Sequence, residues 1–281
     1  MHTIKKHMLT LDLKDYIFLL KPRSQDVHKG DFGKVLIIGG NEGLAGAVRL
    51  AGEAALRSGA GLVIILTHQQ HAPYLQATRP ELIVHGIRDA VDMTNHLNNA
   101  DVIAIGPGLG QTKWSQQLLQ AALQIKDKPM IFDADALNLL PNSAYHSLAD
   151  HVYTPHPGEA ARLLQCKVDN IQQQRTEALN KLIAKYAGIM VLKGAGTLIS
   201  QRQKPTYICN HGNPGMATAG MGDVLTGIIA ALIGQKMPLL DAVCLAVLIH
   251  ALAADMAAKQ GQRGLIASDL FPYLPTILNP L

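Results

Sequence analysis

Short apolar runs rich in Val and Ile alternate with helix-length stretches along most of the chain. Residues 34–39 (KVLIIG) have the pattern of a buried strand, and residues 45–58 have that of a helix stopped by glycine. Further strands are predicted at residues 62–66, 101–105, 129–132 and 189–192, and further helices at residues 115–125 and 171–186. Near-continuous apolar strands that alternate with helices predict an α/β fold, in which helices cover both faces of a parallel sheet.

The pattern changes after residue 193. Residues 197–200 and 206–209 predict two strands joined by a polar turn, which indicates a hairpin at the edge of the sheet. Three helices are then predicted at residues 222–233, 239–259 and 267–278. No internal repeat or Pro/Ser-rich linker interrupts the sequence. We therefore expect one domain over residues 1–281, with residues 1–24 as a leader that packs elsewhere.

Composition narrows the classes of partner. The net charge of +4 is spread along the 281 residues, and only 4% of them are aromatic. A nucleic-acid partner is therefore not expected, because neither a dense basic run nor a stacking platform is present. A mild basic excess is compatible with phosphorylated ligands. The three cysteines lie far apart without a Cys-x-x-Cys pair, which argues against disulfides and a zinc site. They are Cys166, Cys209 and Cys244.

No targeting segment is predicted. The N-terminal residues 1–20 contain two aspartates and no small-residue cleavage site, so they do not resemble a signal peptide. The most apolar later segment, residues 242–258, is interrupted by His250 and Asp255 and is expected to fall short of a membrane span. We therefore expect a cytoplasmic protein that contacts no membrane.

Four glycine-rich turns follow predicted strands, at the edge where parallel sheets bind their ligands. The turns at residues 39–46 and 106–110 match neither the P-loop nor Gly-x-Gly-x-x-Gly, and each alone favours a plain tight turn. Residues 193–197 (KGAGT) could lay backbone amides along a nucleotide. Residues 218–223 (TAGMGD) open a strongly apolar helix and are the more informative of these turns.

The start of that helix is a candidate anion site. The backbone N–H groups of Gly220, Met221 and Gly222 are available there to bind a phosphate. Asp223 has two interpretations at this place. It is either an ordinary N-cap, or a carboxylate that takes a proton from a hydroxyl attacking the phosphate. Without further context the residue pattern favours the cap.

Ordered motifs supply that context. Between residues 28 and 269 the chain carries GGNEGLAGA, RSGAGLV, GPGLG, DADALN, TPHPGE, LKGAGT, GNPGMAT and GMGDVLTGIIAALI. The Gly-x-Gly-Asp turn resembles that of ribokinase-like kinases, and the full set resembles the ADP/ATP-dependent NAD(P)H-hydrate dehydratases of that superfamily. The resemblance implies a three-layer sandwich with a mostly parallel central sheet and an edge hairpin.

The resemblance also implies an activity. The family dehydrates the S-form of NADHX and NADPHX, cofactors damaged by addition of water to the nicotinamide ring. The added hydroxyl is phosphorylated by ADP or ATP, with ADP expected here, and phosphate then leaves. The net reaction is that of a lyase on a kinase fold, with Mg²⁺ as cofactor. The family further implies a homotetramer and a separate NAD(P)HX epimerase, because no epimerase domain is recognisable in this sequence.

Residue roles follow from the matched motifs. Asp223 is implied as the base on the substrate hydroxyl. The hydrated cofactor would contact Ala45, Gly108, His156 and Asp223. The nucleotide would contact Lys193, Gly194, Ala195, Gly196, Thr197 and Gly222. Without the resemblance, His156 is equally well interpreted as a loop histidine that bonds nearby backbone.

Several polar residues keep two interpretations. Asp133 and Asp135 follow a predicted strand and could hold magnesium through water, or could simply mark a strand end and a helix cap. Glu159 is expected in the first turn of a helix rather than in the chemistry. A core position is expected for His250 and packing roles for Met216 and Met221, whereas Asn210, His211 and Asn213 could orient the nucleotide.

One departure from the family pattern concerns the catalytic turn. Relatives commonly carry a glycine and a small hydroxyl residue where this chain has Ala219 and Met221. Loss of the hydroxyl would remove one phosphate contact. Two rival functions remain open at this point. One is a thiazole or pyridoxal kinase of the same superfamily, and the other is a catalytically silent nucleotide-binding protein.

Overall fold

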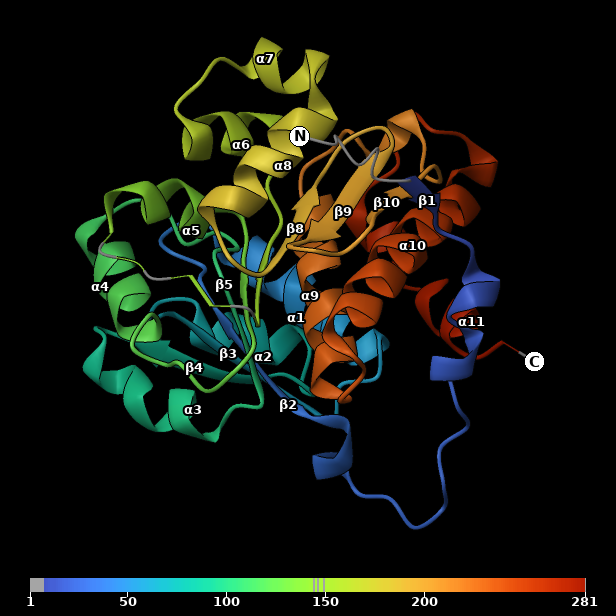
Figure 1. Ribbon diagram of the computed structural model, residues 1–281. Coiled ribbons are helices and arrows are strands. Elements are labelled where there is room, and N and C mark those ends of the chain that lie inside the picture. Colours follow the sequence, from blue (N-terminus) through green and yellow to red (C-terminus); the bar gives the residue numbers. More distant parts are fainter. Residues whose placement is uncertain (1–7, 144, 146, 149, 281) are drawn as a thin grey trace.

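One long, mostly parallel sheet forms the centre of the computed structural model, which describes residues 8–143, 145, 147–148 and 150–280 (Figure 1). The strand order is β1-β10-β9-β8-β7-β6-β5-β2-β3-β4, and β9 alone among these strands runs antiparallel to its neighbours. The strands are β1 Met8–Thr10, β2 Lys34–Ile38, β3 Leu62–His68, β4 Ile83–Ile87, β5 Val102–Ile105, β6 Met130–Phe132, β7 His151–Tyr153, β8 Ile189–Leu192, β9 Thr197–Gln201 and β10 Thr206–Cys209.

Helices cover both faces of this sheet. One face carries α1 Ala45–Arg57, α2 Ala72–Thr78, α9 Met221–Gly234, α10 Leu239–Ala257 and α11 Leu274–Leu278. The other carries α3 Thr94–Asn99, α4 Lys113–Ala122, α5 Ala134–Leu139, α6 Pro157–Leu164, α7 Val168–Gln173 and α8 Arg175–Lys185. Short 3-10 turns lie at Leu13–Asp15, Ile17–Leu19, Lys29–Phe32, Val91–Met93, Leu140–Asn142, Pro214–Met216, Ala258–Gln260 and Ala267–Leu270. The expected three-layer architecture is confirmed.

The apolar runs of the sequence are explained by burial on both faces. In β2, Val35 and Ile37 pack into the core beneath α1 and α9, whereas Leu36 and Ile38 pack into the core on the opposite face. Successive strand side chains point to opposite faces, so a strand covered on both sides must be apolar throughout. The predicted strands and the hairpin are therefore confirmed.

Two expected helices are divided. The predicted helix 171–186 is two helices, α7 and α8, because Gln174 between them has non-helical dihedral angles, with a φ of -133° and a ψ of 53°. The predicted helix 267–278 consists of a 3-10 turn and α11. The short strands β1, β4 and β7 were not predicted. His85 and Gly86 interrupt the apolar pattern in β4, and β1 is exposed along its length.

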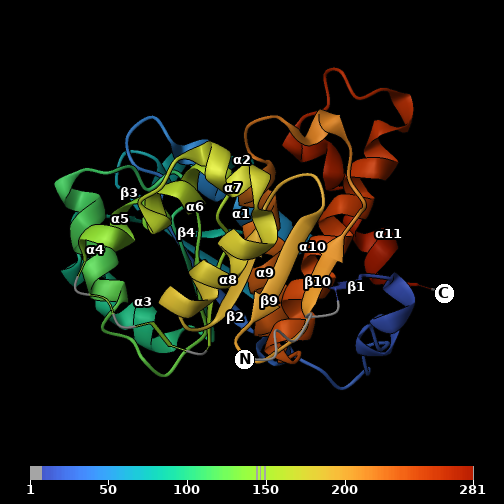
Figure 2. The same cartoon turned by 45° about the horizontal axis from the view of Figure 1, so that its top comes forward.

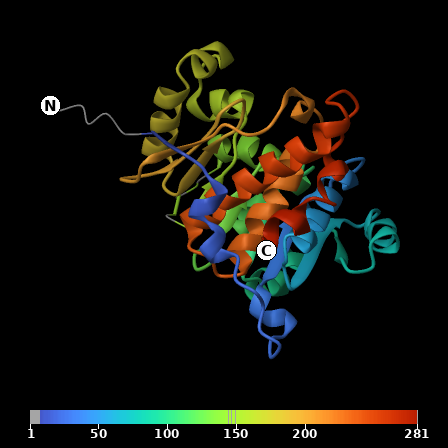
Figure 3. The same ribbon diagram turned by 90° about the vertical axis from the view of Figure 1, so that its right-hand side faces the viewer.

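The expectation that the leader packs elsewhere is wrong for the described part of it. Met8–Thr10 pairs in parallel with β10, so β1 and not the hairpin forms this edge of the sheet. Leu11 and Tyr16 are buried in the core, and Tyr16 hydrogen-bonds Cys244 of α10. Figure 3 shows this N-terminal segment (blue) against the C-terminal helices (red).

The longest helix, α10, is strongly apolar. Residues Leu239–Gln260 are long and apolar enough to cross a membrane by length and composition, contrary to the expectation from sequence. Within the fold, 67% of the most apolar window is buried. The helix packs against α9 and α11, and its His250 is buried while its Asp255 remains partly exposed. Its apolar composition is accounted for by this core position.

Close packing places α9 over the sheet. An added Cβ at Gly227 would lie 2.1 Å from the carbonyl oxygen of Ala51 in α1, so only glycine permits this approach. In Figure 2 the hairpin of β9 and β10 lies between α8 and α10. Three segments meet at the carboxyl ends of the central strands: the first turn of α9, the end of β8 and the end of β6.

Candidate active site

The Gly-Met-Gly-Asp turn forms an uncapped helix start. Gly220 is the N-cap of α9, with a φ of 91°, and it has no side chain that could cap the helix. An added Cβ there would lie 2.5 Å from Cδ1 of Leu50, so the position requires glycine on both conformational and steric grounds. The N–H groups of Gly220, Met221 and Gly222 precede the first intrahelical bond, from Val224 to Gly220. An anion can therefore be bound by these N–H groups.

Asp223 is the third residue of the helix and not its cap. The capping interpretation is therefore wrong. Burial and the neighbouring Asp133 raise the pKa of Asp223 to about 7, against the opposing effect of Lys193. The described residues act on this carboxylate through charge and burial, without a hydrogen bond. A carboxylate with such a pKa is suited to accept a proton at neutral pH.

The departure at Met221 leaves the turn intact. Its side chain is 5% exposed and packs into the core beneath α9, as expected for a packing residue, while its N–H remains at the helix start. Met216 is partly buried against the same core. Ala219 is exposed. The turn therefore retains its backbone donors, and what it lacks is a side-chain hydroxyl.

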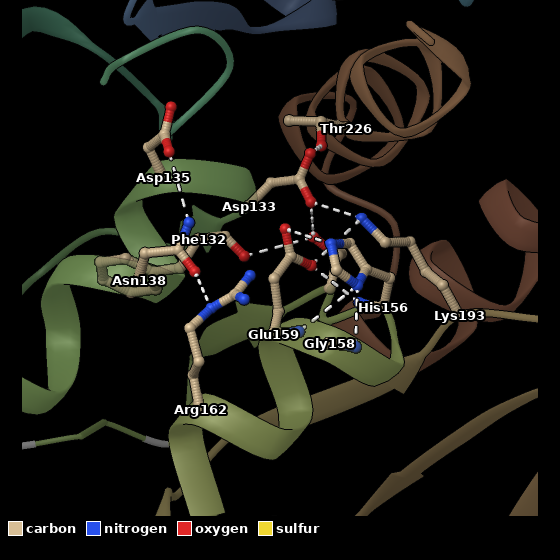
Figure 4. Close-up of polar contacts among 11 residues, drawn as sticks. Phe132, Asp133, Asp135, Asn138, His156, Gly158, Glu159, Arg162, Lys193 and Thr226 are labelled. Atoms are coloured by element: carbon tan, nitrogen blue, oxygen red, sulfur yellow. Dashed lines mark hydrogen bonds and ion pairs between the residues drawn. The ribbon is translucent and has the colours of Figure 1, made fainter. Parts of the chain in front are cut away.

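Lys193 lies at the centre of the site. Its Nζ is 2.7 Å from Oδ1 of Asp133 and 3.8 Å from Oε2 of Glu159 (Figure 4). An added Cβ at Gly222 would lie 3.2 Å from the same Nζ, so the glycine lets the ammonium approach the first turn of α9. Burial lowers the pKa of Lys193, but Asp133 and Glu159 outweigh it and the net pKa is raised. The side chain is thus a fixed cation.

Asp133 is a fixed anion. It is 1% exposed and accepts hydrogen bonds from Oγ1 of Thr154 at 2.7 Å and Oγ1 of Thr226 at 2.9 Å. Burial alone would raise the pKa of Asp133, but Lys193 and these hydroxyls lower it. Its charge is therefore held permanently opposite Lys193.

Asp135 points away from this cluster. Its Oδ2 accepts from the N–H of Gly110 at 2.8 Å, and its Oδ1 from Nδ2 of Asn138 at 3.3 Å. Asp133 occupies the N-cap position of α5 but makes no capping bond. Within the described residues, no group of three or more His, Cys, Asp or Glu side chains is arranged to hold a metal ion. The two carboxylates are thus used separately.

His156 begins α6 and is tied to it by a capping box. Its Nδ1 accepts from the N–H groups of Gly158 at 2.9 Å and Glu159 at 3.3 Å. Oε2 of Glu159 accepts from the His156 N–H at 2.7 Å. The backbone bonding that one of its two interpretations gave this histidine is present, and half of its side chain remains exposed.

Glu159 is a site residue that the sequence interpretation missed. It does lie in the first turn of α6, but its carboxylate faces Lys193 and is buried, at 4% exposed. Burial and Asp133 raise the pKa of Glu159 to about 7, against Lys193. The His-x-x-Glu spacing was the available sign of the capping box, but not of the contact with Lys193.

The KGAGT loop follows β8. Arg175 at the start of α8 donates to the carbonyl oxygens of Leu192 at 3.0 Å and Gly196 at 3.3 Å, so it fixes the loop from behind. The hydroxyl of Thr197 donates to the carbonyl oxygen of Gly194 at 2.9 Å. This use of Arg175 could not be predicted from the sequence, because its partners are backbone carbonyl groups.

The first two glycine turns meet each other. Asn41 N–H donates to the carbonyl oxygen of Gly108 at 2.7 Å, and an added Cβ at Gly108 would lie 2.5 Å from the carbonyl oxygen of Leu44. Ala45 is the next residue and begins α1. The structure therefore brings the predicted positions Ala45 and Gly108 together.

The loop that precedes the Gly-Met-Gly-Asp turn is hydrogen-bonded to α10. Asp255 accepts from Gly212 N–H at 2.9 Å and Nδ2 of Asn213 at 3.0 Å, and it lies 3.7 Å from Nδ1 of His211. The amide of Asn213 is thus used within the protein. His250 is buried in α10, and burial lowers its pKa to about 4, so it is the neutral core histidine that was predicted.

Comparison with known proteins places this arrangement in a family. A family model described as NAD(P)H-hydrate dehydratase matches residues 35–276. The chain belongs to the NAD(P)H-hydrate dehydratase family. It is 48% identical, over 271 residues and 96% of its length, to a bifunctional NAD(P)H-hydrate repair enzyme of Coxiella burnetii, of which it covers 55%. The chain thus spans about half the length of the curated relatives it matches.

Solved structures of similar proteins agree with the fold. A ribokinase-like superfamily protein of Enterococcus faecalis has a TM-score of 0.88 at 34% identity, with 96% of this chain and 95% of that chain covered. An ADP/ATP-dependent NAD(P)H-hydrate dehydratase of Bacillus subtilis, co-crystallised with ATP/Mg²⁺, has a TM-score of 0.84 at 30% identity, with 96% and 97% covered. The ribokinase-like fold of the family is therefore confirmed.

Proposed function

We propose that this chain dehydrates the S-form of NADHX and NADPHX to NADH and NADPH, using a nucleotide as phosphoryl donor, with ADP expected. The observation that carries the proposal is the carboxylate of Asp223, which makes no hydrogen bond to the described residues and lies in the first turn of α9 near the Lys193 ammonium. This pairing of a base and a phosphate site supports phosphorylation of a hydroxyl. Membership of the dehydratase family supports the subsequent loss of phosphate.

The chemistry divides into two steps. Asp223 takes the proton of the substrate hydroxyl, whose oxygen forms a bond to the terminal phosphorus as the bond to the nucleotide breaks. The N–H groups of Gly220, Met221 and Gly222 and the ammonium of Lys193 stabilise the transferring charge. The carbon–oxygen bond then breaks with its electrons going to phosphate. Loss of a proton from the adjacent ring carbon restores the double bond, so hydroxide never has to leave.

The ligand contacts belong to the same proposal. The hydrated nicotinamide is placed against Ala45, Gly108, His156 and Asp223, and the nucleotide against Gly222 and the loop of Lys193, Gly194, Ala195, Gly196 and Thr197. The support is spatial. Lys193 N–H donates to the carbonyl oxygen of Pro155 at 2.9 Å, so the loop that bears His156 and the KGAGT loop are adjacent.

Mg²⁺ is proposed to arrive with the nucleotide. Mg²⁺ commonly uses one or two carboxylates together with substrate phosphates, rather than a cage of protein ligands. The residues fit binding of Mg²⁺ together with phosphate. The carboxylates of Asp133 and Asp135 already accept hydrogen bonds from the protein. Those of Asp223 and Glu159 leave an excess of negative charge around Lys193. When bound, the ion would neutralise phosphate charge. A homotetramer, a cytoplasmic location and cooperation with an epimerase remain part of the proposal.

The test is a dehydration assay on NADHX and NADPHX with ADP and ATP in parallel, with and without Mg²⁺. The expected result is recovery of the absorbance of the reduced nicotinamide together with free phosphate. A stable phosphorylated product would instead identify a small-molecule kinase. No change with any donor would identify a silent nucleotide-binding protein, and either result contradicts the proposal.

A further inference from the structure

Glu159 lies between the two loops assigned to different ligands. On one side its carboxylate contacts His156, with Oε2 2.7 Å from the backbone nitrogen and Oε1 3.3 Å from Nε2. On the other side Oε2 lies 3.8 Å from Nζ of Lys193. Figure 4 shows the carboxylate of Glu159 beside the imidazole of His156, with the ammonium of Lys193 near both. One buried group thus touches both the TPHPGE loop and the KGAGT loop.

These contacts fix the imidazole of His156. Because Nδ1 accepts two backbone N–H groups, the proton of the neutral ring resides on Nε2 and faces Oε1 of Glu159. Both ring nitrogens are therefore occupied by α6 itself. The half-exposed ring is presented to the site in one orientation, and Glu159 supplies the contact that holds its outer nitrogen.

We propose that Glu159 is a positioning residue that couples nucleotide binding at Lys193 to binding of the hydrated nicotinamide at His156. The inference rests on the proposed function, which assigns a ligand to each loop. The ammonium of Lys193 attracts Asp133 and Glu159 in the structure. When a nucleotide phosphate binds the ammonium of Lys193, the attraction between Lys193 and Glu159 weakens. The carboxylate of Glu159 then binds the N–H groups of His156 more strongly. Each ligand then binds more tightly in the presence of the other, and by the same factor.

The coupling requires an ionised Glu159. The groups that face this carboxylate are His156 and Arg162 of α6, Lys193 after β8, Asp133 after β6 and Asp223 of α9. Burial and Asp133 raise the pKa of Glu159 to about 7, against Lys193. The coupling should therefore be stronger at about pH 8, where the carboxylate is charged, than at about pH 6, where it is mostly protonated.

The test measures ADP affinity by titration calorimetry with and without saturating NADPH, which lacks the added hydroxyl and cannot react. In the wild type, NADPH should raise ADP affinity by about fivefold or more, a typical coupling between two sites. In Glu159→Gln, NADPH should change the affinity for ADP by less than about twofold. Glu177→Gln is the matched control, because it removes an exposed carboxylate paired with Lys181 at 2.8 Å and should retain the wild-type factor.

Equal factors in the wild type and Glu159→Gln, or a wild-type factor of one, would overturn the coupling. If Glu159→Gln does not fold, the wild type alone decides, since a factor unchanged between about pH 6 and about pH 8 also overturns it. Turnover separates the two proposals. Dehydration of NADPHX without this coupling would contradict only the role inferred for Glu159. Cooperative binding of both ligands without dehydration of NADPHX would contradict only the proposed reaction.

Discussion

The end of β6 and the first turn of α9 each bring an aspartate to the same lysine, and the two aspartates differ in every chemical respect. Asp133 is held by Lys193, Thr154 and Thr226, so its pKa is lowered although it is buried. Asp223 is partly buried and makes no hydrogen bond to the described residues, and burial and Asp133 raise its pKa to about 7. For Asp133 the charge of Lys193 and the hydrogen bonds outweigh burial, whereas for Asp223 burial and the charge of Asp133 outweigh Lys193. Partners therefore decide which carboxylate is a permanent charge and which can take a proton.

Removing the carboxylate of Asp223 should have the largest effect. Asp223→Asn keeps the size of the side chain but cannot accept the proton, so the kcat for NADPHX should fall by about 10²–10⁴-fold. ADP binding, measured by calorimetry, should be retained because the N–H groups and Lys193 remain. Dehydration at the wild-type rate would show that Asp223 is not the base.

The corresponding change at Asp133 should act mainly on stability. Asp133→Asn leaves the buried ammonium of Lys193 without its closest anion, which should lower the free energy of unfolding by about 3–5 kcal/mol. Urea unfolding measures this loss. Asp135→Asn is the control, since Asp135 faces Gly110 and Asn138 instead of the lysine and should cost clearly less. Equal losses would remove the distinction between the two carboxylates.

Asp223→Asn should stabilise the protein above neutral pH. A carboxyl group whose pKa is raised on folding holds its proton more tightly in the folded state. Stability therefore falls as pH rises from the unfolded pKa toward about 7. The variant avoids this cost and should gain about 1–3 kcal/mol at about pH 8, with little gain at about pH 4. The pH dependence of stability that comes from Asp133 has the opposite sign. Its pKa is lowered on folding, so it stabilises the protein above the unfolded pKa, and that stability is lost on acidification. A destabilised Asp223→Asn at high pH contradicts the account.

The smallest expected effect concerns one hydroxyl. Thr226 donates to Oδ2 of Asp133 at 2.9 Å within the buried part of α9. Thr226→Val preserves the shape but removes this donor, so the free energy of unfolding should fall by about 1–3 kcal/mol. Thr226→Ser keeps the hydroxyl and should lose less. If both variants lose the same amount, packing and not the hydrogen bond is what Thr226 contributes.

Sequence patterns predicted the layers of the fold and the position of the Gly-Met-Gly-Asp turn at the start of α9. Apolar strands are evident because burial on both faces demands them, and Gly220 is evident because the turn requires a positive φ. The pairing of Asp133 with Lys193 was not predictable, since the two residues lie 60 positions apart and DADALN was equally compatible with other roles.

Arg175 and Glu159 were missed for related reasons. Arg175 bonds carbonyl groups, which leave no trace in the sequence of their partners. Glu159 belongs to a local capping box that accounts for it fully, so its long-range contact with Lys193 adds nothing that the sequence pattern could reveal. Residues that serve a local and a distant role at once are the ones that pattern analysis underestimates.

The most direct test is a carbon-13 NMR titration of the side-chain carboxyl carbons of Asp133 and Asp223 in the wild-type protein. Asp223→Asn and Asp133→Asn assign the two resonances. Asp223 should titrate with a pKa of about 7, whereas Asp133 should stay ionised below the usual range of an aspartate. Similar midpoints for the two residues, or a higher pKa for Asp133, would contradict the roles proposed for the two carboxylates.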